Sequence, residues 1–334
     1  MRPPYFWSGA VDPRSRESAP LTRILLTPLA WIYAGMTARR LQRTTPLRLG
    51  ARVLCVGNLT VGGTGKSPVV DALRRRITAK TGLRTASLSR GYKGRLKGPC
   101  QVEPSQHGAG DVGDEPLMLA QSGESWIGAD RAKAGTAMED AGVDVIIMDD
   151  GHQNPGLFKD LTIIVIDAQV GFGNGHVIPK GPLRESPVAG LQRADLVLKL
   201  GEGPLPDAVR QSGCPVMEAR IVPTHQPEPG PYVGFAGIGR PEKFFETLRS
   251  LGLDLCDAIP FPDHHTYRPA DLAYLHQLAE GHNARLITTE KDLIRLPEED
   301  RAGLEALGIT IQFDDEEGLD SFLQPIFTQG ASHG

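Results

Sequence analysis

The feature that most constrains this chain is a glycine-rich loop set between an apolar strand and a helix. Residues 60–67 read TVGGTGKS, follow the apolar run RVLCV at 52–56, and precede a predicted helix over 67–81. Glycines let successive backbone N–H groups point at one phosphate, and the positive end of the following helix adds to that field. A strand, phosphate loop and helix in this order predict a nucleotide-binding domain built on a parallel α/β sheet.

The loop itself contains most of the groups that a nucleotide site requires. Lys66 can reach the β- and γ-phosphate oxygens, and the hydroxyl of Ser67 can bind Mg²⁺. The Walker A pattern has a glycine six residues before its lysine, and here that position is Thr60. A glycine-rich turn with an incidental lysine is the alternative interpretation. The expected nucleotide-binding residues are Thr60, Val61, Gly62, Gly63, Thr64, Gly65, Lys66 and Ser67.

Two carboxylates, Asp149 and Asp150, follow the apolar run DVIIM at 144–148. A carboxylate at the C-terminal end of a parallel strand faces the same crevice as the phosphate loop, where it can hold Mg²⁺ directly or through water. The pair could instead cap a loop. The sequence has no N-K-x-D motif for guanine, which favours ATP over GTP.

The first 48 residues differ in charge from the rest of the chain. They contain eight arginines and two acidic residues, a net of +6, whereas the whole chain of 334 residues has a net charge of -4. The remainder therefore carries about -10. A basic segment in front of an acidic body indicates that the segment meets something anionic: a membrane surface, a nucleic acid or an acidic partner.

Residues 21–43 predict a helix with an apolar stripe and arginines at its end. Trp31 and Tyr33 lie beside the stripe. Such a helix can lie in a membrane interface, or it can pack on the protein's own core with its arginines in water. The apolar stretch 24–38 is about 15 residues long, too short to cross a bilayer, which takes roughly 20. The stripe consists of Leu21, Ile24, Leu25, Leu29, Ile32 and Met36.

Further apolar runs alternate with predicted helices, which is typical of α/β proteins. The Pro- and Gly-rich stretch 201–231 predicts a linker to a second α/β unit, whose last strand is expected at 309–313. We therefore predict an N-terminal amphipathic helix segment (1–48), a P-loop NTPase-like α/β/α domain (49–220) and a second, smaller α/β/α domain (221–330) that completes the active-site cleft.

Ten short motifs, in order along the chain, resemble those of the tetraacyldisaccharide 4'-kinase family of lipid A synthesis. Together they extend over roughly residues 20 to 296. The motifs are PLAWIY (28–33), VGNLT with GGTGKSP (56–68), SRGY (89–92), GDEP (113–116), DDGHQ (149–153), GNG (173–175), PKGPLRE (179–185), FAGIG (235–239), DHH (263–265) and TEKD (289–292).

The resemblance implies a kinase that transfers the γ-phosphoryl group of ATP to the 4'-hydroxyl of tetraacyldisaccharide 1-phosphate, an acylated glucosamine disaccharide, with Mg²⁺. It also implies a peripheral protein on the cytoplasmic face of the inner membrane, attached to this anionic surface by its N-terminal helix and with no nucleic acid partner. Four widely spaced cysteines agree with that location, because they indicate reduced thiols.

The resemblance further assigns catalytic roles. It implies that Asp114 is the general base and that His264, rather than His265, pairs with it, while Lys66 stabilises the transferred phosphate. An alcohol is a poor nucleophile at neutral pH, so a positioned carboxylate can take its proton. Asp114 could instead cap the helix expected near Pro116.

Other matched positions have weaker assignments. Glu115 joins Ser67, Asp149 and Asp150 as a candidate metal ligand. Candidate substrate contacts are Arg90, Arg184 and Asn174; the two arginines could instead be solvated surface charges.

The sequence also departs from the family pattern in three places. Asn154 stands where the family has histidine, His152 stands two places earlier, and Lys180 takes a place that is more often small. No role is transferred to His152.

Two other functions fit parts of the pattern. A phosphate-loop kinase for a soluble substrate would use the N-terminal helix as a core element. A membrane-associated ATPase would turn over ATP without phosphorylating an acceptor. Both keep the phosphate loop, and they differ in what the N-terminal helix and Asp114 do.

Overall fold

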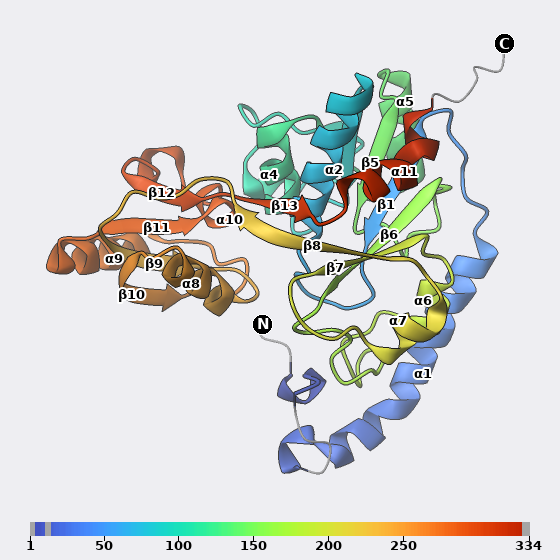
Figure 1. The fold of residues 1–334 in the computed structure, drawn as a ribbon, viewed down its shortest axis with the longest axis horizontal. Helices are drawn as coiled ribbons and strands as arrows, with labels where there is room; N and C mark the ends of the chain where they lie inside the picture. Colours follow the sequence, from blue (N-terminus) through green and yellow to red (C-terminus); the bar gives the residue numbers. More distant parts are fainter. Residues whose placement is uncertain (1–3, 11–14, 329–334) are drawn as a thin grey trace.

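The computed structural model describes residues 4–10 and 15–328, and within them the chain forms two separate sheets (Figure 1). The larger sheet has the strand order β13-β8-β7-β6-β1-β5-β2-β4-β3. Its pairs are parallel except for β13 with β8 and β3 with β4, at the two edges. Its strands are β1 (Arg52–Gly57), β2 (Thr85–Ser89), β3 (Cys100–Gln101), β4 (Ser125–Ile127), β5 (Val145–Asp149), β6 (Leu161–Asp167), β7 (Leu196–Leu200), β8 (Val216–Pro223) and β13 (Ile309–Phe313).

Helices cover both faces of this sheet, which explains why its central strands are apolar along their whole length. In β1, Leu54 and Val56 pack with the helices of one face, while Val53 and Cys55 pack with those of the other. The first face carries α2 (Lys66–Thr81), α4 (Asp114–Ser122) and α11 (Glu316–Phe327). The second carries α5 (Arg131–Asp140), α6 (Pro187–Leu191) and α7 (Asp207–Ser212). The short helix α3 (Ala109–Val112) comes directly before α4.

The smaller sheet is entirely parallel, in the order β10-β9-β11-β12. Helix α8 (Pro241–Ser250) packs on one face through its phenylalanines, and α9 (Pro269–His282) packs on the other through Leu272 and Leu275. This arrangement confirms the second α/β/α layer structure. Its strands are β9 (Pro231–Ala236), β10 (Asp254–Pro260), β11 (Arg285–Thr289) and β12 (Leu304–Leu307), and the short helix α10 (Glu290–Leu293) follows β11.

The end of the chain returns to the larger sheet, so the prediction that strand 309–313 belongs to the second unit is wrong. β13 pairs antiparallel with β8, with Ile311 opposite Ile221. Ile311 and Phe313 are buried with α11 in the core of the larger sheet. The pairing covers β8, which would otherwise be an open edge. The stretch 201–231 is likewise not only a linker, because it contains α7 and β8.

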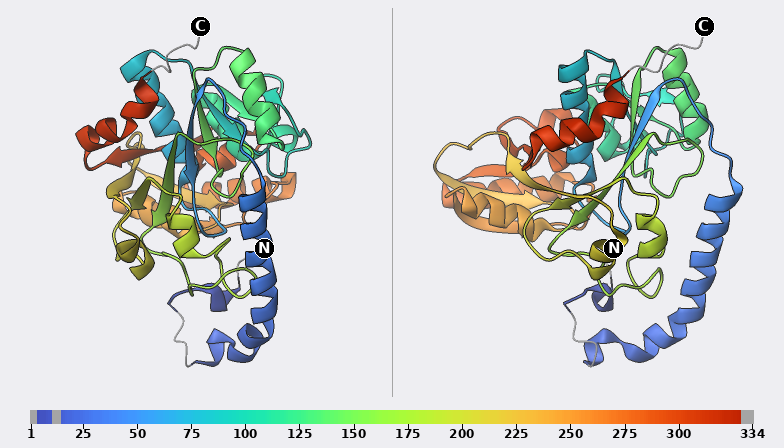
Figure 2. Two further views of the ribbon diagram at one scale, coloured as in Figure 1. Left: turned by 90° about the vertical axis from the view of Figure 1, so that its right-hand side faces the viewer. Right: turned by 45° about the vertical axis from the view of Figure 1, so that its right-hand side comes forward.

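We call the larger sheet with its helices the large unit, and residues 224–308 around the smaller sheet the small unit. Outside both, α1 (Pro20–Arg43) runs along the outer side of the large unit and projects beyond it (Figure 2). Its predicted apolar stripe is not a core element: the exposed fraction ranges from 53% for Leu29 to 76% for Leu21 and Leu25. Within the described ranges, no helix combines the length and apolarity needed to cross a membrane.

Candidate active site

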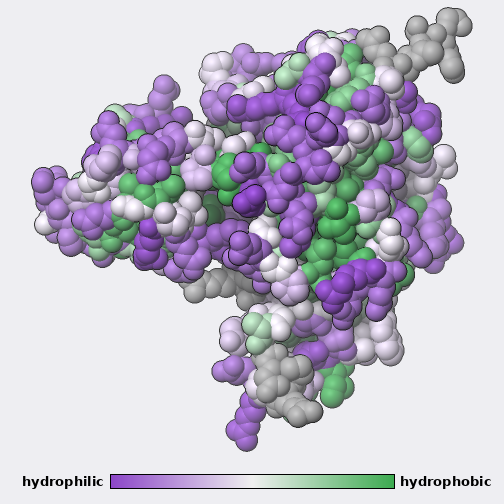
Figure 3. Space-filling model, viewed as in Figure 1, coloured by the Kyte–Doolittle hydropathy of each residue, from purple (hydrophilic) through white to green (hydrophobic). Residues whose placement is uncertain are grey.

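A cleft of about 1560 Å³ lies where β1 and β5 end, and residues of α1, the large unit and the small unit all line it. The small unit projects from the large one, and its visible surface is mostly hydrophilic (Figure 3). The phosphate loop, Asp114, Asp149 and His264 are among the lining residues. The fold therefore brings the predicted nucleotide and catalytic residues to one cavity.

The phosphate loop leaves β1 and leads directly into α2, which begins at Lys66. Gly62 and Gly65 have φ of 113° and 83°, in the left-handed region that favours glycine. Thr60 has no such conformation and pairs with Leu183 in an antiparallel bridge. A threonine can therefore replace the expected glycine at this position without backbone strain.

Lys66 and Arg184 both contact Asp150. Lys66 Nζ lies 3.5 Å from Asp150 Oδ1, and Arg184 Nη1 donates to both carboxylate oxygens at 2.8 Å. Burial raises the pKa of Asp150, but the charges of Lys66 and Arg184 outweigh it and lower that pKa to about 2. Asp150 is therefore ionised and its charge is balanced by two cations. Arg184 is not a solvated surface charge.

Asp149 offers a free oxygen beside Ser67. The Ser67 hydroxyl donates to Asp149 Oδ2 at 3.2 Å, while Asp149 Oδ1 is buried and accepts no hydrogen bond from the part of the chain that the structure describes. Burial and the negative charge of Glu115 raise the pKa of Asp149 to about 7. Residues 4–10 and 15–328 contain no cluster of three or more metal-ligating side chains. Mg²⁺ that arrives with a nucleotide needs only one or two carboxylates from the protein. The Asp149 carboxylate and the Ser67 hydroxyl therefore fit this ion.

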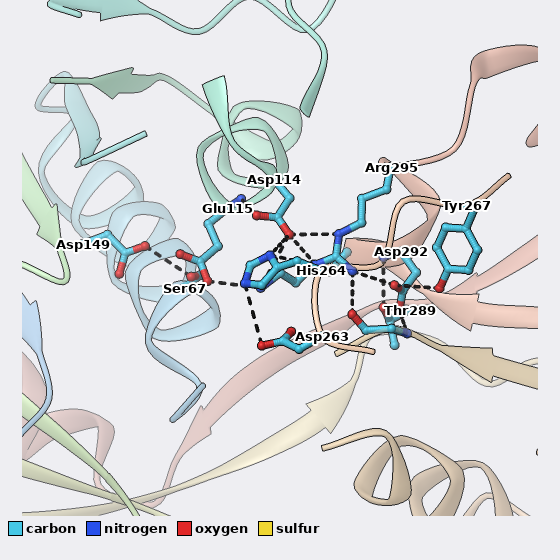
Figure 4. Close-up of polar contacts among 12 residues, drawn as sticks. Ser67, Asp114, Glu115, Asp149, Asp263, His264, Tyr267, Thr289, Asp292 and Arg295 are labelled. Atoms are coloured by element: carbon cyan, nitrogen blue, oxygen red, sulfur yellow. Dashed lines mark hydrogen bonds and ion pairs between the residues drawn. The ribbon is translucent and has the colours of Figure 1, made fainter. Parts of the chain in front are cut away.

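Asp114 meets its partners from the small unit at the other end of the cleft (Figure 4). His264 Nδ1 lies 2.8 Å from Asp114 Oδ2, and Arg295 Nε donates to the same oxygen at 2.9 Å. Burial opposes ionisation of Asp114, but the hydrogen bond with His264 and the charges of Lys291 and Arg295 hold its pKa well below its usual range. Asp114 is therefore a carboxylate. The predicted contact between Asp114 and His264 is present in the structure, while its catalytic role stays a prediction.

The alternative roles of the neighbouring residues can also be compared with the structure. Gly113, not Asp114, is the N-cap of α4, and no side chain caps that helix end. His265 pairs with Asp271, at 3.0 Å, instead of Asp114. Glu115 accepts a hydrogen bond from Lys291 at 3.1 Å, so a cation already occupies this candidate metal ligand.

The substrate candidates separate into two groups. Arg90 and Arg184 line the cleft. Asn174 is not among the lining residues; its amide donates to the carbonyls of Phe6 and Lys180 at 2.8 and 3.0 Å. The structure therefore gives Asn174 a place in a turn and does not bring it to the cleft.

Sequence reasoning missed Arg295 and left Lys291 without a role. Arg295 lies just after α10, three residues beyond Asp292 of the TEKD motif, and both Lys291 and Arg295 contact Asp114 Oδ2. A spacing of three residues on a helix is the only signal that could have connected Arg295 to the motif.

Comparison with known proteins agrees with the motifs. A sequence model of the family described as "Tetraacyldisaccharide-1-P 4'-kinase" (LpxK) matches residues 22–328. The chain belongs to this 4'-kinase family. Tetraacyldisaccharide 4'-kinase of Hyphomonas neptunium is 54% identical over 327 residues, with 98% of each chain covered. That of Maricaulis maris is 46% identical over 98% of this chain and 96% of its own.

A solved 4'-kinase structure supports the same assignment. LpxK from Aquifex aeolicus, crystallised in complex with ATP, is 26% identical and has a TM-score of 0.72. The likeness extends over 92% of this chain and all of that one. The fold of the 4'-kinase family is therefore shared across nearly the whole chain.

Proposed function

We propose that this chain transfers the γ-phosphoryl group of ATP to the 4'-hydroxyl of tetraacyldisaccharide 1-phosphate in lipid A synthesis. One observation carries the proposal: the phosphate loop and the ionised Asp114 line a single cleft. A phosphate loop alone fits any nucleotide hydrolase. A carboxylate held across the same cleft adds the base that an alcohol acceptor needs.

At the nucleotide end, the loop amides and Lys66 bind the phosphates of ATP. Ser67 and Asp149 are the residues that would hold Mg²⁺, and the ion would neutralise charge that develops on the transferred group. Asp150 keeps Lys66 and Arg184 close to the loop through the contacts described above. Arg90, in the cleft lining, is a further cation for phosphate oxygens.

At the acceptor end, Asp114 takes the proton of the 4'-hydroxyl as that oxygen bonds to the γ-phosphorus, while the bond from the γ-phosphorus to the β,γ-bridging oxygen breaks and ADP leaves. His264 orients the carboxylate through its 2.8 Å contact. Because the two residues come from different units, the site is complete only where the small unit lies against the large one, and that contact keeps water from the phosphoryl group.

The exposed stripe of α1 fits the surface of a membrane that contains the acylated acceptor. Its leucines and isoleucines face solvent, Trp31 is 74% exposed, and arginines close the helix. Tyr33, Thr37 and Arg40, from the same helix, line the cleft. A lipid held at α1 therefore has its sugar headgroup next to the catalytic residues. We assign the chain to the cytoplasmic face of the inner membrane, where ATP is available.

The test is to incubate the protein with γ-labelled ATP, Mg²⁺ and tetraacyldisaccharide 1-phosphate in detergent. We expect label in the lipid, a large loss of transfer in Asp114→Asn, and little change in Asp111→Asn, an aspartate that pairs with Arg95 outside the cleft. No transfer by folded protein would contradict the proposal. ATP turnover without labelled lipid, insensitive to Asp114→Asn, would support an ATPase instead.

A further inference from the structure

We infer that Arg295 is a positioning residue, which fixes one oxygen of Asp114 and leaves the other oxygen facing the acceptor hydroxyl. This inference rests on the proposed function and adds a residue to it. It starts from an asymmetry in the contacts of the Asp114 carboxylate (Figure 4).

All charged partners of Asp114 contact the same oxygen, Oδ2. Arg295 reaches it through Nε at 2.9 Å and through Nη2, His264 Nδ1 lies at 2.8 Å, and Lys291 Nζ at 3.8 Å. Within residues 4–10 and 15–328, the other oxygen, Oδ1, accepts only the backbone N–H of Glu115, at 3.1 Å. Oδ1 therefore keeps the lone pair that can accept the hydroxyl proton.

Arg295 is itself held on its far side. Its Nη1 donates to Asp292 Oδ1 at 2.8 Å and to the carbonyl of Gly237 at 2.7 Å, and only 6% of its side chain is exposed. Asp292 is fully buried and also accepts hydrogen bonds from Tyr267 and Thr289, at 2.9 and 2.7 Å. The guanidinium thus links the large unit's carboxylate to a rigid buried group of the small unit.

The chemistry of the side chain explains why an arginine stands here. A guanidinium presents five donors in a fixed plane, so it can contact Asp114, Asp292 and a carbonyl at once. A lysine has a single donor atom and can keep the charge near Asp114 while losing part of this geometry. Among the described residues Arg295 touches neither the phosphate loop nor Asp149, and its Nη2 also lies 3.4 Å from His264 Nδ1, which itself contacts Asp114. Its effect therefore passes through the Asp114 carboxylate and the histidine that pairs with it.

The experiment is a double-mutant cycle in the labelled-transfer assay, with Arg295→Met, Asp114→Asn and the two combined. We expect Arg295→Met to lower kcat roughly 10–100-fold, as loss of a residue that orients a functional group typically does, with the KM for ATP within about twofold. Arg295→Lys restores part of the loss. In the Asp114→Asn background, Arg295→Met has no further effect, because the group it positions is gone. Arg268→Met, an exposed arginine that pairs with Asp271 in the same unit, is the matched control.

The inference is overturned if the two losses multiply, if Arg268→Met lowers kcat equally, or if Arg295→Met raises the KM for ATP with kcat unchanged. If Arg295→Met does not fold, the same double-mutant cycle with Asp114→Asn is measured with Arg295→Gln and Arg295→Lys instead. Absence of transfer by the wild-type protein contradicts the proposed function itself, whereas multiplicative losses with an active wild type contradict only the role of Arg295.

Discussion

The two ends of the cleft are held together in different ways, one by the strands of a single sheet and the other by contact between two units. At the nucleotide end, Lys66 and Ser67 begin α2 after β1, and Asp149 ends β5, which pairs directly with β1. At the acceptor end, Asp114 of the large unit meets His264 and Arg295 of the small unit, 150 and 181 residues away. The first end is built within one sheet, and the second depends on two units meeting.

This difference indicates that ATP binding and phosphoryl transfer can be disturbed separately by mutation. The nucleotide end is built from β1, β5 and α2, with Arg90 and Arg184 from loops of the same large unit. We therefore expect ATP binding not to require the contacts of Asp114. Under the proposed function, phosphoryl transfer requires both ends, because Asp114 as the base has to face the bound nucleotide. The experiments below disturb one end at a time.

The largest effect is expected from Lys66→Met. Loss of this ammonium removes a charge from the transferred phosphate, and we expect transfer to fall roughly 10²–10³-fold together with weaker ATP binding. The measurement is labelled transfer beside ATP titration. Lys80→Met is the control, because Lys80 lies in the last turn of the same helix and pairs with Asp320. Equal losses in both variants would show that the helix, not the loop lysine, is responsible.

Asp149→Asn tests the metal site at the same end. We expect the apparent affinity for Mg²⁺ in the presence of ATP to weaken by roughly tenfold or more, measured by titration calorimetry, with Asp140→Asn as an exposed control. The free carboxyl has a pKa raised to about 7, so Mg²⁺ has to displace a proton below that pH. Wild-type affinity should therefore fall as pH drops from 8 to 6, and the variant should lose this dependence. An unchanged affinity in Asp149→Asn would move the metal elsewhere.

Leu25→Glu tests whether the helix outside both units binds membranes. A side chain that is 76% exposed contributes little to folding, but placing a charge in the stripe should weaken vesicle binding by about tenfold. Flotation with anionic vesicles measures this effect. Gln42→Glu adds the same charge near the end of the helix, outside the stripe. Similar binding by the two variants would mean that the stripe is not the contact.

The last prediction concerns the stability of the fold and not catalysis, through His152, a buried residue that follows Asp149 and Asp150 in the sequence. Burial and the nearby positive charge of Arg193 lower the pKa of His152 to about 3, from 6.5. The unfolded chain therefore takes up a proton below pH 6.5 that the folded chain does not, and stability is lost as pH falls toward 3. At pH 5 this loss is about 2 kcal/mol.

His152→Leu should remove that acid sensitivity, because leucine has no proton to gain. Thermal unfolding of both proteins between pH 7.5 and 5 provides the comparison. The exposed His276→Gln is the control and should follow the wild type. Parallel curves for wild type and His152→Leu would contradict the assignment of a neutral buried histidine.

Sequence patterns were most informative where structure is local. The apolar runs at 52–56 and 144–148 form β1 and β5 with bounds within one residue of those expected, and α2 begins within one residue of the expected start. Each can be recognised from its own apolar run or motif, whichever strands it pairs with in the sheet. The nucleotide end could be predicted for the same reason.

The features that were missed depend on partners far along the chain. The strand β13 reads as the last strand of the second unit until its antiparallel pairing with β8 is known. Arg295 is one of many arginines, and only the meeting of two units reveals its contact with Asp114. The pairing of Asp114 with His264 came from family resemblance, since nothing in the spacing of the two residues indicates it.

The independence of the two ends is tested most directly by measuring ATP affinity and phosphoryl transfer on the same preparation of Asp114→Asn. We expect transfer to fall roughly 10²–10⁴-fold, as loss of a general base typically does, while the Kd for ATP stays within about twofold of the wild type. A fall in ATP affinity parallel to the fall in transfer, or transfer close to the wild-type rate, would contradict this division of the cleft.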